Sequence, residues 1–309
     1  MTRQSELGAF LQARRAGLRP RDVGLLPDAV RRRVPGLRRE EVARLAGVST
    51  DYYTRLEQGR KASASEPVLN AVARALRLDD TGRQHLLDLA RPALARPTSG
   101  TEKAQRVRWT TQQLIESWTD QPATLLRRRM DVLATNALAR ALIFDFSTLP
   151  AAERNYTRWV LLHPHARELF RDWEVIAAEM VAVLRMEAGR FPNDRGISDL
   201  IGELAVKSKD FPGWWADQRV LAHCHGTKRF HHQLVGDLDL EFQGLVLLGD
   251  EDQTIFVYFA APGSPAAEKL ALLASWIAPP TRRPDTNAGV PAPSIAKTIS
   301  SPRPSPKDR

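Results

Sequence analysis

Residues 36–61, GLRREEVARLAGVSTDYYTRLEQGRK, constrain the fold of this chain more than any other stretch. Apolar residues recur there at the three- and four-residue intervals of amphipathic helices. They are Val42, Ala43 and Leu45 in the first half and Tyr53 and Leu56 in the second. Gly47 permits the positive φ of a tight turn between the halves, and Ser49 is a favoured N-cap residue. We therefore predict a helix-turn-helix, in which each helix buries the apolar face of the other.

A unit of this kind places its second helix in the major groove of DNA, with the N-terminal residues of that helix on base edges. Pairs of helices joined by a glycine turn also occur in helical proteins that bind no nucleic acid. The arginines around this pair favour DNA, because phosphate contacts need clustered positive charge. We predict DNA contacts from Arg38, Arg39, Ser49, Thr50, Asp51, Tyr52, Arg55, Arg60 and Lys61. Upstream, Arg31, Arg32 and Arg33 either follow DNA phosphates or form a solvated loop.

Charge is distributed unevenly along the 309 residues, whose formal net charge is +9. Residues 1–96 carry 19 basic against 11 acidic side chains, whereas residues 97–280 carry 20 against 23. The N-terminal part is therefore suited to a polyanion and the middle is not. The length allows two domains, and an apolar content of 43% is that of an ordinary globular protein.

The helix-turn-helix is expected to belong to a five-helix domain over residues 1–90. A first helix over residues 5–16 begins with Ser5 as its N-cap. Its apolar stripe consists of Leu7, Phe10 and Leu11. Two more helices follow the helix-turn-helix, the fourth after Ser65 as N-cap and the fifth over residues 79–89.

Residues 91–121 are expected to connect this domain to a second one. Their first part, residues 91–101, is a linker by its proline and glycine content. A helix over residues 102–118 follows, and it either extends the linker or packs on the second domain.

Mixed strand and helix patterns over residues 122–278 predict an α+β domain. Two short strands flank a turn near residues 129–131, a long helix covers residues 166–188, and a further helix begins with Ser198 as N-cap. Three strands with alternating residues follow. Their apolar or inward positions are Phe230, His232, Leu234, Leu238, Leu240, Phe242, Ile255, Val257 and Phe259. This order of elements is that of a PAS-like domain, an antiparallel sheet with helices over one face.

The N-terminal residues resemble a known family. Gly36 to Ala43, Gly47-Val48-Ser49 and residues 52–60, YYTRLEQGR, are similar to the helix-turn-helix of XRE-family regulators of the type common in actinobacteria. The resemblance implies an all-α domain of the lambda-repressor-like class that binds double-stranded DNA.

The second domain resembles the MmyB-like ligand-binding domain that follows this same helix-turn-helix. The similar segments are residues 130–142, MDVLATNALARAL, Arg171-Asp172-Trp173, residues 226–232, GTKRFHH, and residues 261–264, APGS. The resemblance implies a one-component transcription regulator, whose PAS-like cavity can hold a fatty-acyl type ligand in relatives.

Seven side chains are candidates for lining that cavity, because most are large and apolar or contain sulfur. They are Phe170, Trp173, Met180, Trp214, Trp215, Phe230 and His232. Core packing is the alternative for each of them, since a sheet covered by helices must bury such residues in any case.

His223, His225, His231 and His232 with Cys224 form the one cluster in the sequence that suits metal or acid-base chemistry. Neighbours on a strand, such as His231 and His232, point to opposite faces and are poorly placed to share an ion. The paired ligand spacing of a zinc site is missing, and no oxyanion or substrate motif accompanies Cys224. We therefore expect no metal, no cofactor and no enzyme activity.

Other features set the expected surroundings of the protein. No apolar run approaches the roughly 20 residues that a membrane-spanning helix needs, so no membrane partner is expected. A single cysteine fits a reducing cytoplasm. The proline-rich residues 279–309 are expected to be a disordered tail.

The sequence therefore predicts a ligand-responsive transcription regulator that binds an operator as a homodimer, since two-fold operators match two-fold proteins. Two alternatives stay open. In one, the second domain of a DNA-binding protein binds a partner protein instead of a ligand. In the other, a DNA-tethered enzyme uses the cluster around Cys224.

Overall fold

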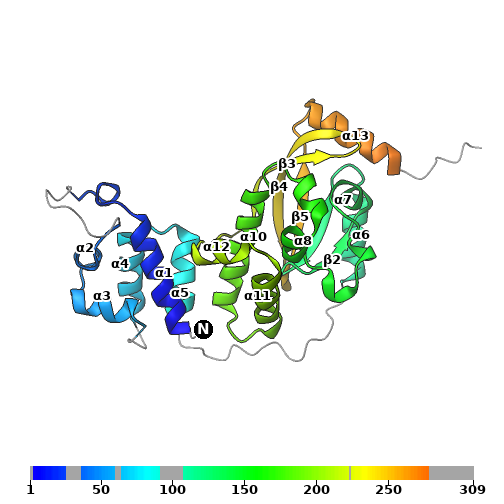
Figure 1. Cartoon of the computed structure of the whole chain (residues 1–309). Coiled ribbons are helices and arrows are strands. Elements are labelled where there is room, and N and C mark those ends of the chain that lie inside the picture. Colours follow the sequence, from blue (N-terminus) through cyan, green and yellow to red (C-terminus); the bar gives the residue numbers. More distant parts are fainter. Residues whose placement is uncertain (1–2, 26–35, 60–63, 91–106, 223, 278–309) are drawn as a thin grey trace, which may run out of the picture. The chain divides into compact units, whose positions relative to one another are not determined.

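The structure is a computed structural model that describes residues 3–25, 36–59, 64–90, 107–222 and 224–277 (Figure 1). Several predictions fall outside these ranges. They concern Arg31 to Arg33, Arg60, Lys61, the linker 91–101, His223 and the tail 279–309.

The described part of the N-terminal domain is helical, as predicted (Figure 1). Its helices are α1 (Arg3–Gly17), α2 (Arg39–Ala46), α3 (Thr50–Glu57), α4 (Glu66–Ala75) and α5 (Asp80–Ala90), with a short 3-10 turn at Pro20–Val23. The apolar residues predicted for α1 and for both helices of the helix-turn-helix meet in one core, with Leu45 as the exception. Leu45 is 37% exposed, because Ala46 rather than Leu45 continues the buried face of α2.

The turn between α2 and α3 has the predicted chemistry. Gly47 adopts a φ of 66°, and the Ser49 hydroxyl accepts a hydrogen bond from the Tyr52 amide at 3.1 Å. Ser65 is the N-cap of α4, also as predicted. The prediction for Ser5 was wrong, because α1 begins at Arg3 and Ser5 lies inside it.

A five-stranded antiparallel sheet forms the centre of the second domain. Its strands are β1 (Ala123–Arg127), β2 (Val132–Thr135), β3 (His225–His232), β4 (Gly236–Leu247) and β5 (Asp250–Phe259), in the spatial order β2-β1-β5-β4-β3. The first two strands pair across a turn where Met130 has a φ of 65°. This mixed architecture confirms the predicted fold class, a helical domain followed by a PAS-like α+β domain.

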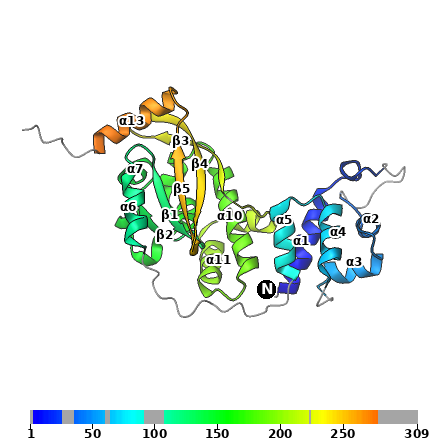
Figure 2. The same ribbon diagram turned by 180° about the vertical axis from the view of Figure 1, so that it is seen from behind.

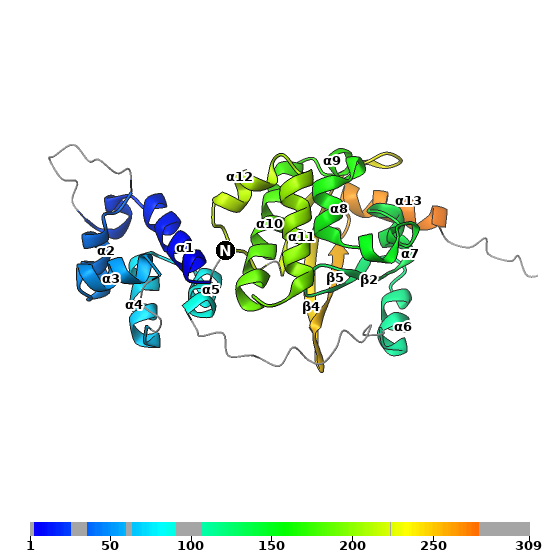
Figure 3. The same ribbon diagram turned by 60° about the horizontal axis from the view of Figure 1, so that its bottom comes forward.

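Helices cover one face of this sheet, as predicted. They are α7 (Ala137–Leu142), α8 (Tyr156–Leu162), α9 (Pro164–Leu169), α10 (Trp173–Arg190), α11 (Arg195–Lys207), α12 (Phe211–Ala216) and α13 (Pro265–Ile277). Short 3-10 turns at Phe146–Thr148 and Ala151–Glu153 lie between α7 and α8. Figure 3 shows α8, α10 and α11 packed beside one another over the strands.

The opposite face is also covered at the β1–β5 end, which the one-face prediction missed. Ile115 of α6 (Trp109–Ser117) packs there with Leu125 of β1 and with Ile255 and Val257 of β5. Figure 2 shows α6 beside β1 and β2. The described part of the predicted helix 102–118 therefore belongs to the second domain.

Three local predictions for this domain were wrong. The helix predicted over 166–188 is interrupted, because Phe170 forms a β-bridge with Phe230 and the Arg171 amide donates to the Arg229 carbonyl at 3.0 Å. The N-cap of α11 is Asp194 rather than Ser198. Leu234 and Phe259 lie at strand ends and are 66% and 44% exposed.

Candidate DNA and ligand sites

The N-terminal half of α3 presents its polar side chains to solvent. Ser49, Thr50 and Asp51 are exposed, while Tyr52 is half-buried. Arg55 lies one turn further along and forms an ion pair with Asp51 at 2.9 Å, in which both side chains are more than half exposed. An exposed pair of this kind is weak and can exchange its partner for a phosphate or a base.

Arg39 has a different environment from the other predicted DNA contacts. Its guanidinium lies 3.0 Å from the Glu57 carboxylate, whose other hydrogen bonds come from Arg15 at 2.9 and 3.0 Å. The Glu57 side chain is 2% exposed. Burial alone would raise the pKa of Glu57, but the hydrogen bonds and charges of Arg15 and Arg39 hold that pKa below its ordinary value. The hydrogen bonds of Arg15 and Arg39 to Glu57 thus connect α3 to α1 and to the start of α2.

The second domain buries an aromatic layer between the sheet and its helices. The rings of Phe170 and Phe230 lie 5.4 Å apart, and Phe230 is in edge contact with Tyr258 at 5.9 Å. Met180 of α10 is completely buried in the same core. Three of the seven predicted ligand residues therefore share one core layer.

The tryptophans and His232 among the predicted ligand residues lie in more specific contacts. Trp173 packs edge-on against Trp214 at 5.7 Å and donates its indole hydrogen to the Val160 carbonyl at 2.8 Å. Trp215 stacks on Phe211 at 5.4 Å. Both ring nitrogens of His232 are engaged, Nε2 with the Ala141 carbonyl at 2.9 Å and Nδ1 with the Leu234 amide at 3.3 Å. These bonds suit a structural role for His232, and its ligand role stays a prediction.

Comparison with known families decides what these two domains are. Residues 107–273, more than half of the chain, match the family described as the MmyB-like transcription regulator ligand binding domain. The chain belongs to the MmyB-like transcription regulator family. Residues 6–86 also match a helix-turn-helix domain family. A search of curated proteins found no match. The protein is thus a DNA-binding transcription regulator with a ligand-binding domain, as both resemblances implied.

The MmyB-like domain contains one polar residue that the sequence reasoning overlooked. Lys228 lies on β3, two residues before Phe230 and on the same inward side, and its side chain is 2% exposed. Its ammonium has no hydrogen-bond partner among the described residues. The alternating pattern of β3 places Lys228 on the inward face of the sheet, because residues 228, 230 and 232 share one face of a strand.

His231 and His232, two of the histidines near Cys224 in the sequence, do not converge. His231 is exposed and lies 2.6 Å from the Asp237 carboxylate, whereas His232 is buried on the other face of β3, as predicted from the strand period. Cys224 is exposed and free. Within the described ranges, no group of three or more His, Cys, Asp or Glu residues is arranged to bind a metal ion.

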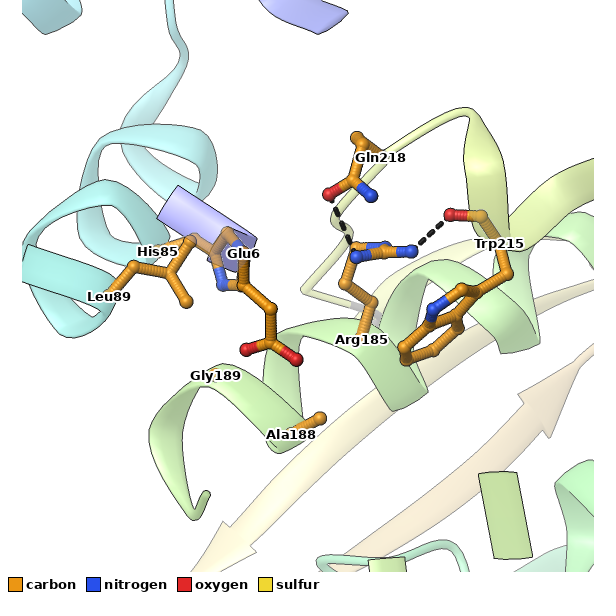
Figure 4. A pocket seen from close by; sticks show the side chains of 8 residues that line it. All are labelled: Glu6, His85, Leu89, Arg185, Ala188, Gly189, Trp215 and Gln218. Atoms are coloured by element: carbon orange, nitrogen blue, oxygen red, sulfur yellow. Dashed lines mark hydrogen bonds between the residues drawn. The ribbon is translucent and has the colours of Figure 1, made fainter. Parts of the chain in front are cut away.

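A small pocket lies elsewhere in the regulator, where residues of α1 and α5 meet α10 and the end of α12 (Figure 4). It is lined by Glu6, His85, Leu89, Arg185, Ala188, Gly189, Trp215 and Gln218. The Arg185 guanidinium in this lining stacks 3.9 Å from the Trp215 ring centre and donates to Gln218 at 2.8 Å (Figure 4). Burial lowers the pKa of His85 to about 3, so this histidine is neutral at physiological pH. We assign no ligand to this pocket.

In the described part of the chain, no helix has both the length and the apolar character to cross a membrane.

Proposed function

We propose that this regulator binds an operator as a homodimer, and that a small apolar ligand of fatty-acyl type in the second domain controls its DNA affinity. The observation that supports the ligand is the buried apolar layer of Phe170, Met180 and Phe230 between the sheet and α10. An apolar chain placed in this layer would replace side-chain contacts by equivalent dispersion contacts. A change in the position of α10 would follow, since α10 is the longest helix on that face.

On DNA, α3 would lie in the major groove with Thr50, Asp51 and Tyr52 near base edges. Arg55 would contact a base or a phosphate, and Arg38 and Arg39 would contact phosphates at the start of α2. Arg60 and Lys61 add two positive charges directly after Gly59 in the sequence. Two such helices in a dimer would read two half-sites about one helical turn, roughly 34 Å, apart.

Two measurements on the full chain test this function. Genomic mapping of bound DNA should give a two-fold symmetric site, and mass spectrometry of an organic extract of the native-purified protein should give an acyl compound in molar proportion to protein. Random DNA occupancy would contradict the operator. An extract without any acyl compound, together with no binding of added fatty acids, would contradict the ligand and favour a partner protein for the second domain.

A further inference from the structure

Two helices from different domains approach each other closely at a glycine. Gly189 of α10 faces His85 of α5, and a Cβ at Gly189 would lie 2.5 Å from Cε1 and 2.8 Å from Nδ1 of the His85 ring (Figure 4). His85 is 2% exposed and packs edge-on against Phe10 of α1 with ring centres 5.0 Å apart, so its ring has little room to move. The approach of α10 to the helix-turn-helix domain therefore requires glycine at position 189.

A second connection between the two domains lies beside the first. Arg14 of α1 donates to the backbone carbonyl of Gln218, which follows α12. Arg185 of α10 donates to the side-chain oxygen of the same Gln218 at 2.8 Å. Burial lowers the pKa of His85, and the charges of Arg185 and Arg14 lower it further, so these three side chains lie close together. We call Gly189, His85, Arg14, Arg185 and Gln218 together the α5–α10 contact.

The α5–α10 contact leaves several of its polar atoms unsatisfied. The Nε atoms of Arg14 and Arg185 and the Nδ1 atom of His85 are buried and have no hydrogen-bond partner among the described residues. Opening the contact would expose these atoms to water and recover part of the free energy that their burial costs. Interfaces between domains of one chain generally resemble transient protein interfaces. These features favour a small difference in free energy between a closed and an open arrangement of the two domains, as a regulatory contact requires.

The closed contact is compatible with DNA binding. The helix-turn-helix domain contributes α1 and α5 to it, whereas Ser49, Thr50 and Asp51 at the start of α3 are exposed. A fixed orientation of this domain on the second domain would also fix the positions of both copies of α3 in a homodimer. Such prior ordering lowers the entropic cost of binding two half-sites at once.

We propose that the α5–α10 contact holds the regulator in the state that binds a two-fold operator, and that its opening lowers operator affinity without lowering half-site affinity. The proposal rests on the proposed function, because it concerns how the homodimer presents two copies of α3. Gly189 is a positioning residue in this account. It acts through the orientation of α5 and needs no contact with DNA.

The test compares a DNA duplex that carries the mapped two-fold site with a duplex in which one half-site is scrambled. Fluorescence anisotropy on the full-length natural protein should show tighter binding to the two-fold duplex. Gly189→Ala should weaken binding to the two-fold duplex about tenfold and change half-site binding less than about twofold, because each domain keeps its structure while their mutual orientation is lost. Gly202→Ala in α11 is the matched control, since its added Cβ meets no atom within 4 Å, and it should change neither affinity.

Two further variants separate opening of the contact from damage to the fold. His85→Ala removes the ring atoms that the new Cβ would meet, so it should relieve the loss in Gly189→Ala when the two changes are combined. Arg14→Met removes the bond to Gln218 without adding volume, and it should also lower the preference for the two-fold duplex. Measurements of ¹⁵N relaxation should show the two domains tumbling together in the natural protein and more independently in Gly189→Ala.

The possible outcomes distinguish this inference from the proposed function. An unchanged ratio of the two affinities in Gly189→Ala and Arg14→Met would overturn the role of the contact and leave the operator-binding homodimer standing. An equal loss on both duplexes, or a loss that His85→Ala does not relieve, would also overturn this role. Equal affinity of the natural protein for the two duplexes would overturn the homodimer on a two-fold operator and this inference together.

Discussion

Glu57 connects α3, the helix proposed to lie in the major groove, to α1 and α2. It is buried and accepts hydrogen bonds from Arg15 and Arg39. Glu57→Gln should lower the free energy of unfolding by about 3 kcal/mol, the cost of breaking a buried ion pair on one side. The matched change Asp51→Asn removes an exposed pair and should cost no more than about 0.5 kcal/mol. Urea denaturation of both variants measures the difference.

The same carboxylate predicts a dependence on pH. The folded pKa of Glu57 lies below its unfolded value of about 4.5, so its contribution is complete above that value and is lost as the pH falls through the folded pKa. The loss of stability below pH 4.5 should therefore be shallower in Glu57→Gln than in the natural protein. Parallel acid profiles would show that Glu57 is not held ionised by the two arginines.

Base recognition and phosphate binding can be separated at two residues. Thr50→Ala should change sequence preference at one base position, with a loss of about 1–3 kcal/mol on the operator. Arg60→Ala should weaken operator and random DNA about equally and reduce the salt slope of binding by roughly one. Fluorescence anisotropy on both DNAs checks this, and an identical uniform loss in the two variants would rule out the proposed docking of α3.

At the scale of elements, the local pattern of the helix-turn-helix was predictable, whereas the long-range contacts of the second domain were not. The turn between α2 and α3 depends on local residues, Gly47 at a φ of 66° and Ser49 as N-cap, so the sequence predicted it closely. The break between α9 and α10 depends on a bridge from Phe170 to Phe230, 60 residues away, which no local pattern contains. Lys228 was overlooked because β3 was read from its apolar residues alone.

Helix α10 provides the element-scale test of the ligand site. Met180→Trp adds volume to a completely buried position and should weaken acyl-ligand binding about tenfold, at a cost of about 1–3 kcal/mol in stability. Val175→Trp lies on the same helix at a position that is 57% exposed, and it should change neither quantity by much. Calorimetric titration measures the affinity of each variant for the acyl ligand, and urea denaturation measures its stability. Unaltered binding in Met180→Trp would place the ligand away from α10.

At the scale of the whole molecule, control of DNA binding by a ligand requires both domains. An effector changes DNA affinity only by the difference in its own affinity for the two states of the protein. Residues 1–96 contain every fully buried apolar residue of the described helix-turn-helix core, on which the half-buried Val220 also packs. We therefore expect this fragment to fold, bind half-sites weakly and ignore acyl ligands. Gel-shift titration of the fragment against the full chain tests this. Full operator affinity in the fragment would remove any need for a dimer formed through the second domain.

The most direct test of the account is the operator affinity of the full-length regulator with and without bound acyl ligand, measured by fluorescence anisotropy on one preparation. Coupling between two sites is typically about 1–3 kcal/mol, so the account predicts a change in Kd of at least about fivefold on loading with dodecanoate. The same Kd for the delipidated and the fully loaded protein, with ligand occupancy confirmed by mass spectrometry, would contradict ligand control of DNA binding.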